Sequence, residues 1–536
     1  MALKTKEQYQ ESIRNRKPMD VWFLGEKVDD VTTFPPLAAS FAAISKVYEL
    51  TGDPGWKDML TTTSHLTGET VSIYNAPLQS AEQANNKTRA ARALAEVIGC
   101  CTHRCTGSEG FAGLGPCTYD MDHDLGTNYF ERFTKFMEYV QSNDYSCTVT
   151  VTDVKGLRTL PPNKQPDRDM YVHIDEYRKD GIVISGYKAN QTGILFAHEV
   201  IIVPTTAMKP EDKDFAVACA IPADAPGITY VLGRTPQDKR FFEVNEDIEG
   251  IDLGKMYADH QALAYFDHVF VPNERVFLCG ETEYVGRLLN YFTAVHRLTA
   301  GGCKAGGCSA LAGATSLISD MIGVNKAGHI KEKLSEMAMT AETCYGLSLA
   351  AGTEGFKHPS GFWIPNPLLA HTTKFTCTSA PFNAVRTARE IIAGTGETAC
   401  SELDMRNPTI GKMVQKAFNP GNPAYDAFDR LRATRFVEHM VRGSNWTAMA
   451  LHGGGNSEAA RMMAGRFTDW KHLQDMVKVA TGIEKDPIFC KDVLDSIGRR
   501  AGRIDTTLDL PTMSDVPVES KKVVFEKREL VGSGKK

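Results

Sequence analysis

The sequence predicts an α+β protein built from three successive parts: an N-terminal helical domain over 1–145, a middle antiparallel β domain over 146–280 and a C-terminal helical bundle over 281–536. Two changes in the spacing of apolar residues predict this order, one from helical to strand-like spacing near residue 146 and one back again near residue 281. The chain has 536 residues, 42% of them hydrophobic, which is enough to fill several buried cores.

The first part shows apolar residues at intervals of three and four. The stretches 34–52, 85–105 and 129–144 carry this pattern, which is typical of amphipathic helices. We therefore expect residues from about 5 to 145 to form a helical domain.

The middle part consists of short runs of β-branched and aromatic residues that are broken by turn signals. Asp180 and Gly181 stand between two alternating segments, and an Asp-Gly pair in that position is a strong signal for a β-hairpin. These features predict a mainly antiparallel sandwich or barrel.

The third part returns to helical spacing, in long pieces. They cover 282–300, 309–323, 329–353, 380–394 and 426–452. Four or five such helices form a bundle. The charged tail at 519–536 is expected to be loosely ordered.

Composition and charge exclude some classes of partner. The net charge is −6 and the basic residues are dispersed, so no patch favours a nucleic acid or an anionic membrane. The polar N-terminus lacks the apolar core of a secretory signal, and no run approaches the ~20 apolar residues of a membrane span. We expect a cytoplasmic protein.

The 13 cysteines are then not expected to form a disulfide framework, and clustered ones become candidates for metal ligands. On a helix, Cys101 and Cys105 would project from one face because they are four residues apart. His296 and Cys303 are seven apart, almost two full turns, and would also share a face. Two such pairs could meet as four ligands.

The stretch 296–304, HRLTAGGCK, is expected at the end of an amphipathic helix. Gly301 and Gly302 would let an inorganic centre approach the backbone, and Lys304 would place a cation beside it.

The residues alone leave three readings of this pattern open. Buried cysteine behaves as a small hydrophobic residue, so the pairs could simply be part of the core. Three thiolates and an imidazole also suit a closed zinc site as well as an iron–sulfur cluster. The remaining single cysteines are interpreted as structural, namely Cys117, Cys147, Cys219, Cys279, Cys308, Cys344, Cys377, Cys400 and Cys490.

Over about residues 5 to 480 the chain resembles the 4-hydroxybutyryl-CoA dehydratase family within the flavin-dependent 4-hydroxyphenylacetate 3-hydroxylase superfamily. The stretches that carry the resemblance are 7–30, 100–107, 139–156, 180–208, 266–281, 296–307 and 404–418. The cysteine and histidine pattern is specific to the dehydratase branch.

The resemblance implies an acyl-CoA-dehydrogenase-like fold and a homotetramer with one FAD and one [4Fe-4S] cluster per subunit. The cluster ligands that it implies are Cys101, Cys105, His296 and Cys303. The FAD contacts that it implies are Thr152, Asp153, Lys155, Asn190, Gln191 and Thr192, although from the residues alone these two stretches are good turn sequences. The glycine-rich loops 393–398 and 452–458 could hold a pyrophosphate or simply end helices.

The chemistry implied is radical dehydration of a 4-hydroxyacyl-CoA thioester, with movement of the double bond of vinylacetyl-CoA as a second activity. By this resemblance a base would remove the C2 proton and FAD would accept one electron, so that the C3 hydrogen would become acidic. The cluster would supply a Lewis acid for the leaving hydroxyl. His296 would shuttle the proton, and Lys304 would stabilise negative charge.

The sequence departs from the family at three positions. A family tyrosine is replaced by Ala300, and two family glutamates fall on Gln261 and Met449. None of the three can act as a general base. The chain is therefore either a dehydratase with other groups in these roles, for which His260 and His452 are candidates, or a paralogue that acts on another substrate. A flavin monooxygenase and a zinc-stabilised scaffold are the further alternatives.

Overall fold

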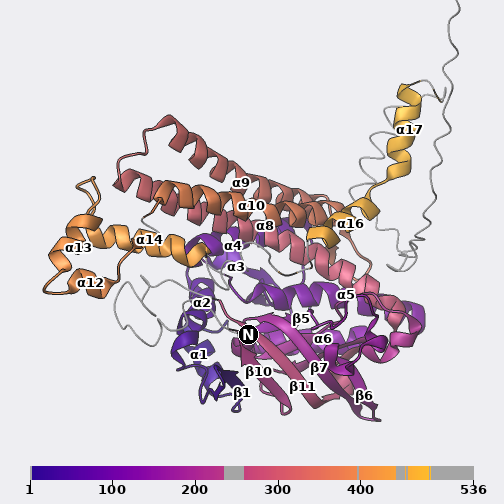
Figure 1. The fold of residues 1–536 in the computed structure, drawn as a ribbon. Coiled ribbons are helices and arrows are strands. Elements are labelled where there is room, and N and C mark those ends of the chain that lie inside the picture. Colours follow the sequence, from indigo (N-terminus) through magenta and orange to yellow (C-terminus); the bar gives the residue numbers. More distant parts are fainter. Residues whose placement is uncertain are drawn as a thin grey trace, which may run out of the picture. The chain divides into compact units, whose positions relative to one another are not determined.

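The computed structural model describes residues 3–99, 101–233, 259–394, 398–441, 453, 455, 457–481 and 483. Helices and sheets are mixed in this fold: helices predominate up to residue 143, most strands lie between 147 and 279, and helices predominate again from residue 282 (Figure 1). No helix within those residues is both long and apolar enough to cross a membrane. The tail at 519–536 lies outside the described residues.

The N-terminal helices are α1 (Lys6–Arg14), α2 (Pro35–Gly52), α3 (Lys57–Leu60), α4 (Ala81–Ile98), α5 (Cys105–Leu125) and α6 (Tyr129–Asn143). The predicted helix over 85–105 is wrong at its end, because Gly99 adopts a left-handed conformation with φ +70° and terminates α4. The short strands β3 (Thr61–Thr63) and β4 (Thr70–Ser72) form a small hairpin in this part.

The middle part contains two sheets. The larger has the order β2-β1-β10-β11-β7-β6 and the smaller β12-β9-β8-β5, and all neighbours are antiparallel except β1/β10 and β5/β8. The larger is built from β1 (Asp20–Phe23), β2 (Glu26–Lys27), β6 (His173–Tyr177), β7 (Gly181–Thr192), β10 (Ile228–Leu232) and β11 (Gln261–Pro272). The smaller contains β5 (Cys147–Thr150), β8 (Glu199–Ile202), β9 (Val217–Pro222) and β12 (Val276–Cys279).

The predicted hairpin at Asp180-Gly181 is confirmed, since β6 and β7 pair with Tyr177 opposite Ile182. Strands β1 and β2 come from the part predicted to be only helical. The two strands pair with each other, and β1 also pairs in parallel with β10, with Asp20 opposite Thr229. The sequence analysis missed them because they have only four and two residues and because β10 is remote in sequence.

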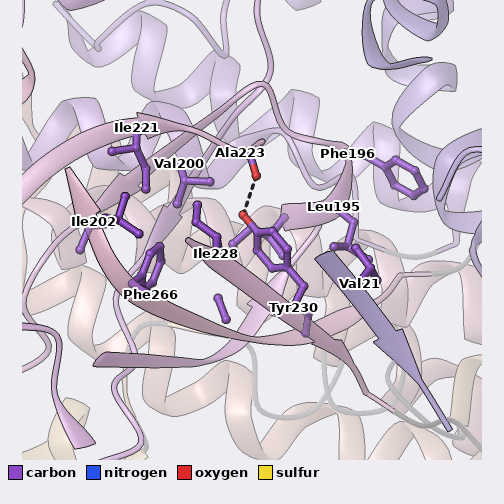
Figure 2. Close-up of a cluster of buried hydrophobic side chains, with 14 of the residues drawn as sticks. Val21, Leu195, Phe196, Val200, Ile202, Ile221, Ala223, Ile228, Tyr230 and Phe266 are labelled. Carbon is purple, nitrogen blue, oxygen red and sulfur yellow. Dashed lines mark hydrogen bonds between the residues drawn. The ribbon is translucent and has the colours of Figure 1, made fainter. Parts of the chain in front are cut away.

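One hydrophobic core joins the two sheets and the first helices. It contains Val200 and Ile221 from the smaller sheet and Ile228 and Phe266 from the larger (Figure 2). The Tyr230 hydroxyl donates to the Ala223 carbonyl at 2.8 Å, which satisfies the polar end of a buried ring (Figure 2).

The C-terminal part begins with the helices α8 (Thr282–Met321), α9 (Gly328–Thr353) and α10 (Pro367–Ile392), which run side by side (Figure 1). Further helices are α12 (Glu402–Arg406), α13 (Gly411–Phe418), α14 (Ala427–Val441), α16 (Ser457–Phe467) and α17 (Trp470–Ala480), and a two-stranded hairpin pairs β13 (Phe356–Lys357) with β14 (Trp363–Ile364).

The prediction that 296–304 lies at a helix end is wrong, because α8 runs unbroken through this stretch for 40 residues. Close packing explains why the glycines do not end the helix. A Cβ at Gly302 would lie 2.3 Å from the Thr88 carbonyl oxygen of α4, and a Cβ at Gly301 would lie 2.6 Å from the Ser348 Cβ of α9. The gain from bringing three helices into contact outweighs the low helix propensity of glycine.

Candidate active site

Cys101 and Cys105 lie beside each other, but not on one helix as predicted. Cys101 belongs to the segment between α4 and α5, and Cys105 is the first residue of α5. His103 between them has φ +63°, a left-handed conformation that turns the chain. The two thiols form a hydrogen bond, which together with burial raises the pKa of Cys105 well above its usual value.

Cys303 approaches this pair from α8. Helices α5 and α8 pack closely, since a Cβ at Gly113 of α5 would lie 2.9 Å from the Phe292 Cβ of α8. Burial raises the pKa of the Cys303 thiol, and the nearby Cys105 raises it further. We call Cys101, Cys105 and Cys303 the α5/α8 thiol group.

His296 lies two turns before Cys303 on α8, and Glu109 of α5 holds its ring, because His296 Nδ1 donates a hydrogen bond to Glu109 Oε2. Glu109 is fully buried, one turn after Cys105. Burial alone would raise the pKa of this carboxyl, but His296, Lys87 and Thr299 outweigh it and hold the pKa below its ordinary value. The sequence analysis missed Glu109, although it is the only charged residue in the first three turns of α5.

Lys304 is buried, with 1% of its surface exposed. Its Nζ has no hydrogen-bond partner within the residues that the structure describes. Burial lowers the pKa of the ammonium group, while Cys303 and the nearby thiols Cys377, Cys308 and Cys101 act in the opposite direction. The lysine therefore lies within electrostatic reach of the predicted cluster ligands, as expected.

The four predicted cluster ligands are only partly gathered. Cys101 and Cys105 form a hydrogen bond, and Cys303 lies within electrostatic reach of Cys105. Glu109, which holds His296, lies within electrostatic reach of both Cys105 and Cys303. Across the described ranges, no three or more His, Cys, Asp or Glu side chains are placed to hold a metal ion. The ligand set stays a prediction. Its chemistry suits a soft metal centre, because neighbouring buried thiols that repel one another as thiolates are stabilised by a cation between them.

The two stretches predicted to contact FAD lie next to each other in space. The Ala189 amide donates to the Thr152 carbonyl at 2.8 Å, and Asp153 forms a buried ion pair with Lys188 at 2.8 Å. The carboxylate of Asp153 therefore fastens one stretch to the other. Lys155 and Asn190 have left-handed backbones with φ of +74° and +57°. Which of the six residues contact a flavin stays a prediction.

Thr192 ends β7, and its hydroxyl donates to Gln261 Oε1 at 2.8 Å. Of the three positions predicted to depart from the family, Gln261 is thus hydrogen-bonded to Thr192, and Ala300 is fully buried on α8. Met449 and the candidate base His452 lie outside the described residues.

His260 does not suit the role of a replacement base. Its Nδ1 lies 2.6 Å from Ser40 Oγ, and its Nε2 accepts from the Leu195 amide at 3.3 Å. Both ring nitrogens are thus used within the fold.

Three cysteines interpreted as structural also come together. Cys344 of α9 and Cys377 of α10 share a buried cluster and form a hydrogen bond, and Cys308 of α8 lies within electrostatic reach of Cys344. We call Cys308, Cys344 and Cys377 the bundle thiol group. Their positions 36, 33 and 69 residues apart gave no sequence signal of this proximity.

Comparison with known proteins identifies the family. The model of the 4-hydroxyphenylacetate 3-hydroxylase N-terminal region matches residues 5–278, and that of its C-terminal region matches 285–482. A protein of Clostridium aminobutyricum named 4-hydroxybutyryl-CoA dehydratase/vinylacetyl-CoA-Delta-isomerase is 36% identical over 90% of this chain and 100% of its own length. The oxygenase component of a 4-hydroxyphenylacetate 3-monooxygenase from Thermus thermophilus is 26% identical over 82% of this chain and 88% of its own.

Solved structures agree. An oxygen-tolerant archaeal 4-hydroxybutyryl-CoA dehydratase from N. maritimus superposes with a TM-score of 0.87 and 32% identity, over 91% of this chain and 97% of that one. The oxygenase component of 4-hydroxyphenylacetate 3-monooxygenase complexed with FAD gives a TM-score of 0.77 at 21% identity, over 92% of this chain and 100% of that one, which shows a shared fold. The chain therefore belongs to the 4-hydroxybutyryl-CoA dehydratase/vinylacetyl-CoA-Delta-isomerase family, within the larger 4-hydroxyphenylacetate 3-hydroxylase family.

Proposed function

We propose that this enzyme is an FAD- and [4Fe-4S]-dependent radical dehydratase of a hydroxyacyl-CoA. The substrate is of the 4-hydroxybutyryl-CoA type, the product is crotonyl-CoA, and vinylacetyl-CoA isomerisation is a second activity. The observation that carries the proposal is the approach of Cys101, Cys105 and Cys303 from two distant segments, in a chain that matches a dehydratase over that protein's full length. The acyl-CoA-dehydrogenase-like domain layout and a homotetramer belong to the same proposal.

The residues of the chain would divide the work as follows. Cys101, Cys105, His296 and Cys303 would hold the cluster, and the stretches at 152–155 and 190–192 would hold the flavin. When bound, the flavin would exchange single electrons with the acyl chain, and the cluster would supply a Lewis acid for the leaving hydroxyl.

His296 would carry the proton. Glu109 holds its Nδ1 and so fixes the orientation of the ring. Lys304 would stabilise the negative charge that develops on the thioester, since its buried ammonium group has no hydrogen-bond partner among the described residues.

The substitutions at Ala300 and Gln261 favour a second candidate, a paralogue that keeps both cofactors and acts on a different acyl-CoA. Neither residue can take or give a proton, and His260 is not available as a substitute. A flavin monooxygenase without a cluster is the third candidate, because it shares the fold.

Anaerobic purification followed by iron, acid-labile sulfide and flavin analysis tests the proposal. We expect iron, sulfide and FAD together. A yellow, iron-free protein would indicate the monooxygenase, and a colourless zinc protein would indicate a scaffold.

An anaerobic screen of hydroxyacyl-CoA thioesters by mass spectrometry then identifies the substrate through the loss of one water. We expect low turnover of 4-hydroxybutyryl-CoA, because the tyrosine and the glutamates are absent. Light scattering in solution checks the tetramer.

A further inference from the structure

A hydrogen-bonded chain of three side chains lies at the end of strand β7. Thr192 of β7 and Gln261 of β11 are direct partners across the two strands. The Thr192 hydroxyl donates to Gln261 Oε1 at 2.8 Å, and Gln261 Nε2 donates to Asp259 Oδ2 at 3.4 Å. Asp259 is 4% exposed, and the Thr192 carbonyl is itself fixed by the Thr148 hydroxyl at 3.4 Å.

The two hydrogen bonds run in one direction, from the Thr192 hydroxyl to the Gln261 amide and from that amide to the Asp259 carboxylate. A carboxylate can only accept hydrogen bonds, so Asp259 requires the NH₂ of the Gln261 amide on its side. The amide oxygen must then face Thr192, and the Thr192 hydroxyl uses its one hydrogen on that oxygen. Toward any ligand, Thr192 Oγ1 can therefore offer only lone pairs.

The position of these three side chains connects them to the predicted flavin site. Thr192 belongs to the stretch predicted to contact FAD.

We propose that Asp259 is a positioning residue that orients the Gln261 amide and, through it, makes Thr192 an acceptor for an N–H group of the bound flavin. This inference rests on the proposed function, because it takes FAD as the ligand. It also explains how Thr192 can act as an acceptor when residue 261 is a glutamine. A glutamate there would accept from Thr192 directly, whereas glutamine can do so reliably only when a neighbouring carboxylate fixes its amide.

The test is the affinity for FAD of apo-protein variants, measured by flavin absorbance and fluorescence with oxidised FAD and, anaerobically, with reduced FAD. Thr192→Val removes the acceptor, and we expect its affinity to fall about tenfold, the value of one good hydrogen bond. Asp259→Asn leaves an amide that can face either way, and we expect a smaller loss, about threefold. Thr192→Ser keeps the hydroxyl and should bind within about twofold of the unmodified chain.

The decisive variant is Asp259→Asn combined with Gln261→Glu. It returns a single carboxylate next to Thr192, so its affinity should recover to that of the unmodified chain. A general loss of packing at Asp259 would not be rescued in this way. The isoalloxazine ring gains N–H groups on reduction, so a loss confined to reduced FAD, or equal in both states, supports the proposal.

Three results would overturn the inference: equal FAD affinity of Asp259→Asn and the unmodified chain, failure of the double variant to recover while it melts normally, or a loss confined to oxidised FAD. If Asp259→Asn does not fold, unchanged affinity of Thr192→Val overturns it instead. Failure of the proposed function looks different, because then the unmodified chain itself binds no FAD.

Discussion

Helix α8 presents thiols on two of its faces, and the two groups differ in what surrounds them. The α5/α8 thiol group lies beside Glu109, Lys87 and the imidazole of His296. The bundle thiol group lies among the apolar residues of α8, α9 and α10, and the charged groups that act on it are the lysines Lys304, which also acts on Cys303, and Lys374. Proximity of thiols alone therefore does not identify a metal site. The carboxylate of Glu109 and the imidazole of His296, which could orient and balance such a site, distinguish the first group.

The largest expected effect tests directly whether the two thiol groups differ in metal binding. We predict that Cys303→Ala lowers iron and acid-labile sulfide to background in anaerobically purified protein, because a thiolate ligand is lost. Cys308→Ala, five residues further along the same helix, is the matched control and should keep its iron. Equal iron in the two variants would show that α8 does not bind a cluster through Cys303.

Glu109 sharpens the comparison, because it occurs only beside the first group. Glu109→Gln should lower the free energy of unfolding by about 3 kcal/mol at pH 7, since it breaks a buried charged hydrogen bond. The folded-state pKa of Glu109 is below its ordinary value. Its stabilisation is therefore complete above the unfolded pKa, about 4.3, and is lost as the pH falls through the folded pKa.

Thermal unfolding from pH 7 to pH 3 measures this difference. The difference in the free energy of unfolding between the unmodified chain and Glu109→Gln should become smaller below about pH 4.3. Glu96→Gln, which breaks a surface pair with Arg92, should cost less than about 1 kcal/mol at any pH. A gap that stays constant with pH would mean that Glu109 acts through packing alone.

The smallest effect concerns the spacing of α8 from its neighbours. Gly302→Ala should destabilise the protein by about 1–3 kcal/mol, because its Cβ would lie 2.3 Å from the Thr88 carbonyl oxygen and push α4 away. A Cβ at Gly313 on the same helix would meet no atom of another element within 4 Å among the described residues. Gly313→Ala should therefore stabilise α8, by up to about 1 kcal/mol. Denaturant unfolding of both variants shows whether each free energy of unfolding rises or falls. Destabilisation of both variants would refute the packing argument.

Local patterns predicted the order of helices and strands and the hairpin at Asp180-Gly181, because each depends on neighbouring residues. They failed where distant segments decide the outcome. The sequence Ala-Gly-Gly after residue 299 indicates a helix end, yet α4 and α9 approach so closely that the helix continues. Strand β1 was missed because it is short and because one of its two partners, β10, is remote in sequence.

The candidate site shows the same division. Cys101 and Cys105 were predicted as a pair for the wrong reason, since Gly99 ends α4 and a loop brings the thiols together. Glu109 and Asp259 were missed, because a single acidic residue has no periodicity and acquires its role only through a partner from another segment. The bundle thiol group was invisible for the same reason.

The continuity of α8 has a consequence for how a cofactor enters. His296 and Cys303 belong to one continuous helix. Their separation along its axis is set by the rise of about 1.5 Å per residue and does not change when a cofactor binds. The opposing Cys101 belongs to a connecting segment that contains the left-handed residues Gly99 and His103. His296 and Cys303 thus have a fixed spacing, whereas Cys101 lies in an irregular segment. Any adjustment of the site to the size of a bound cofactor must therefore come from the segment that carries Cys101.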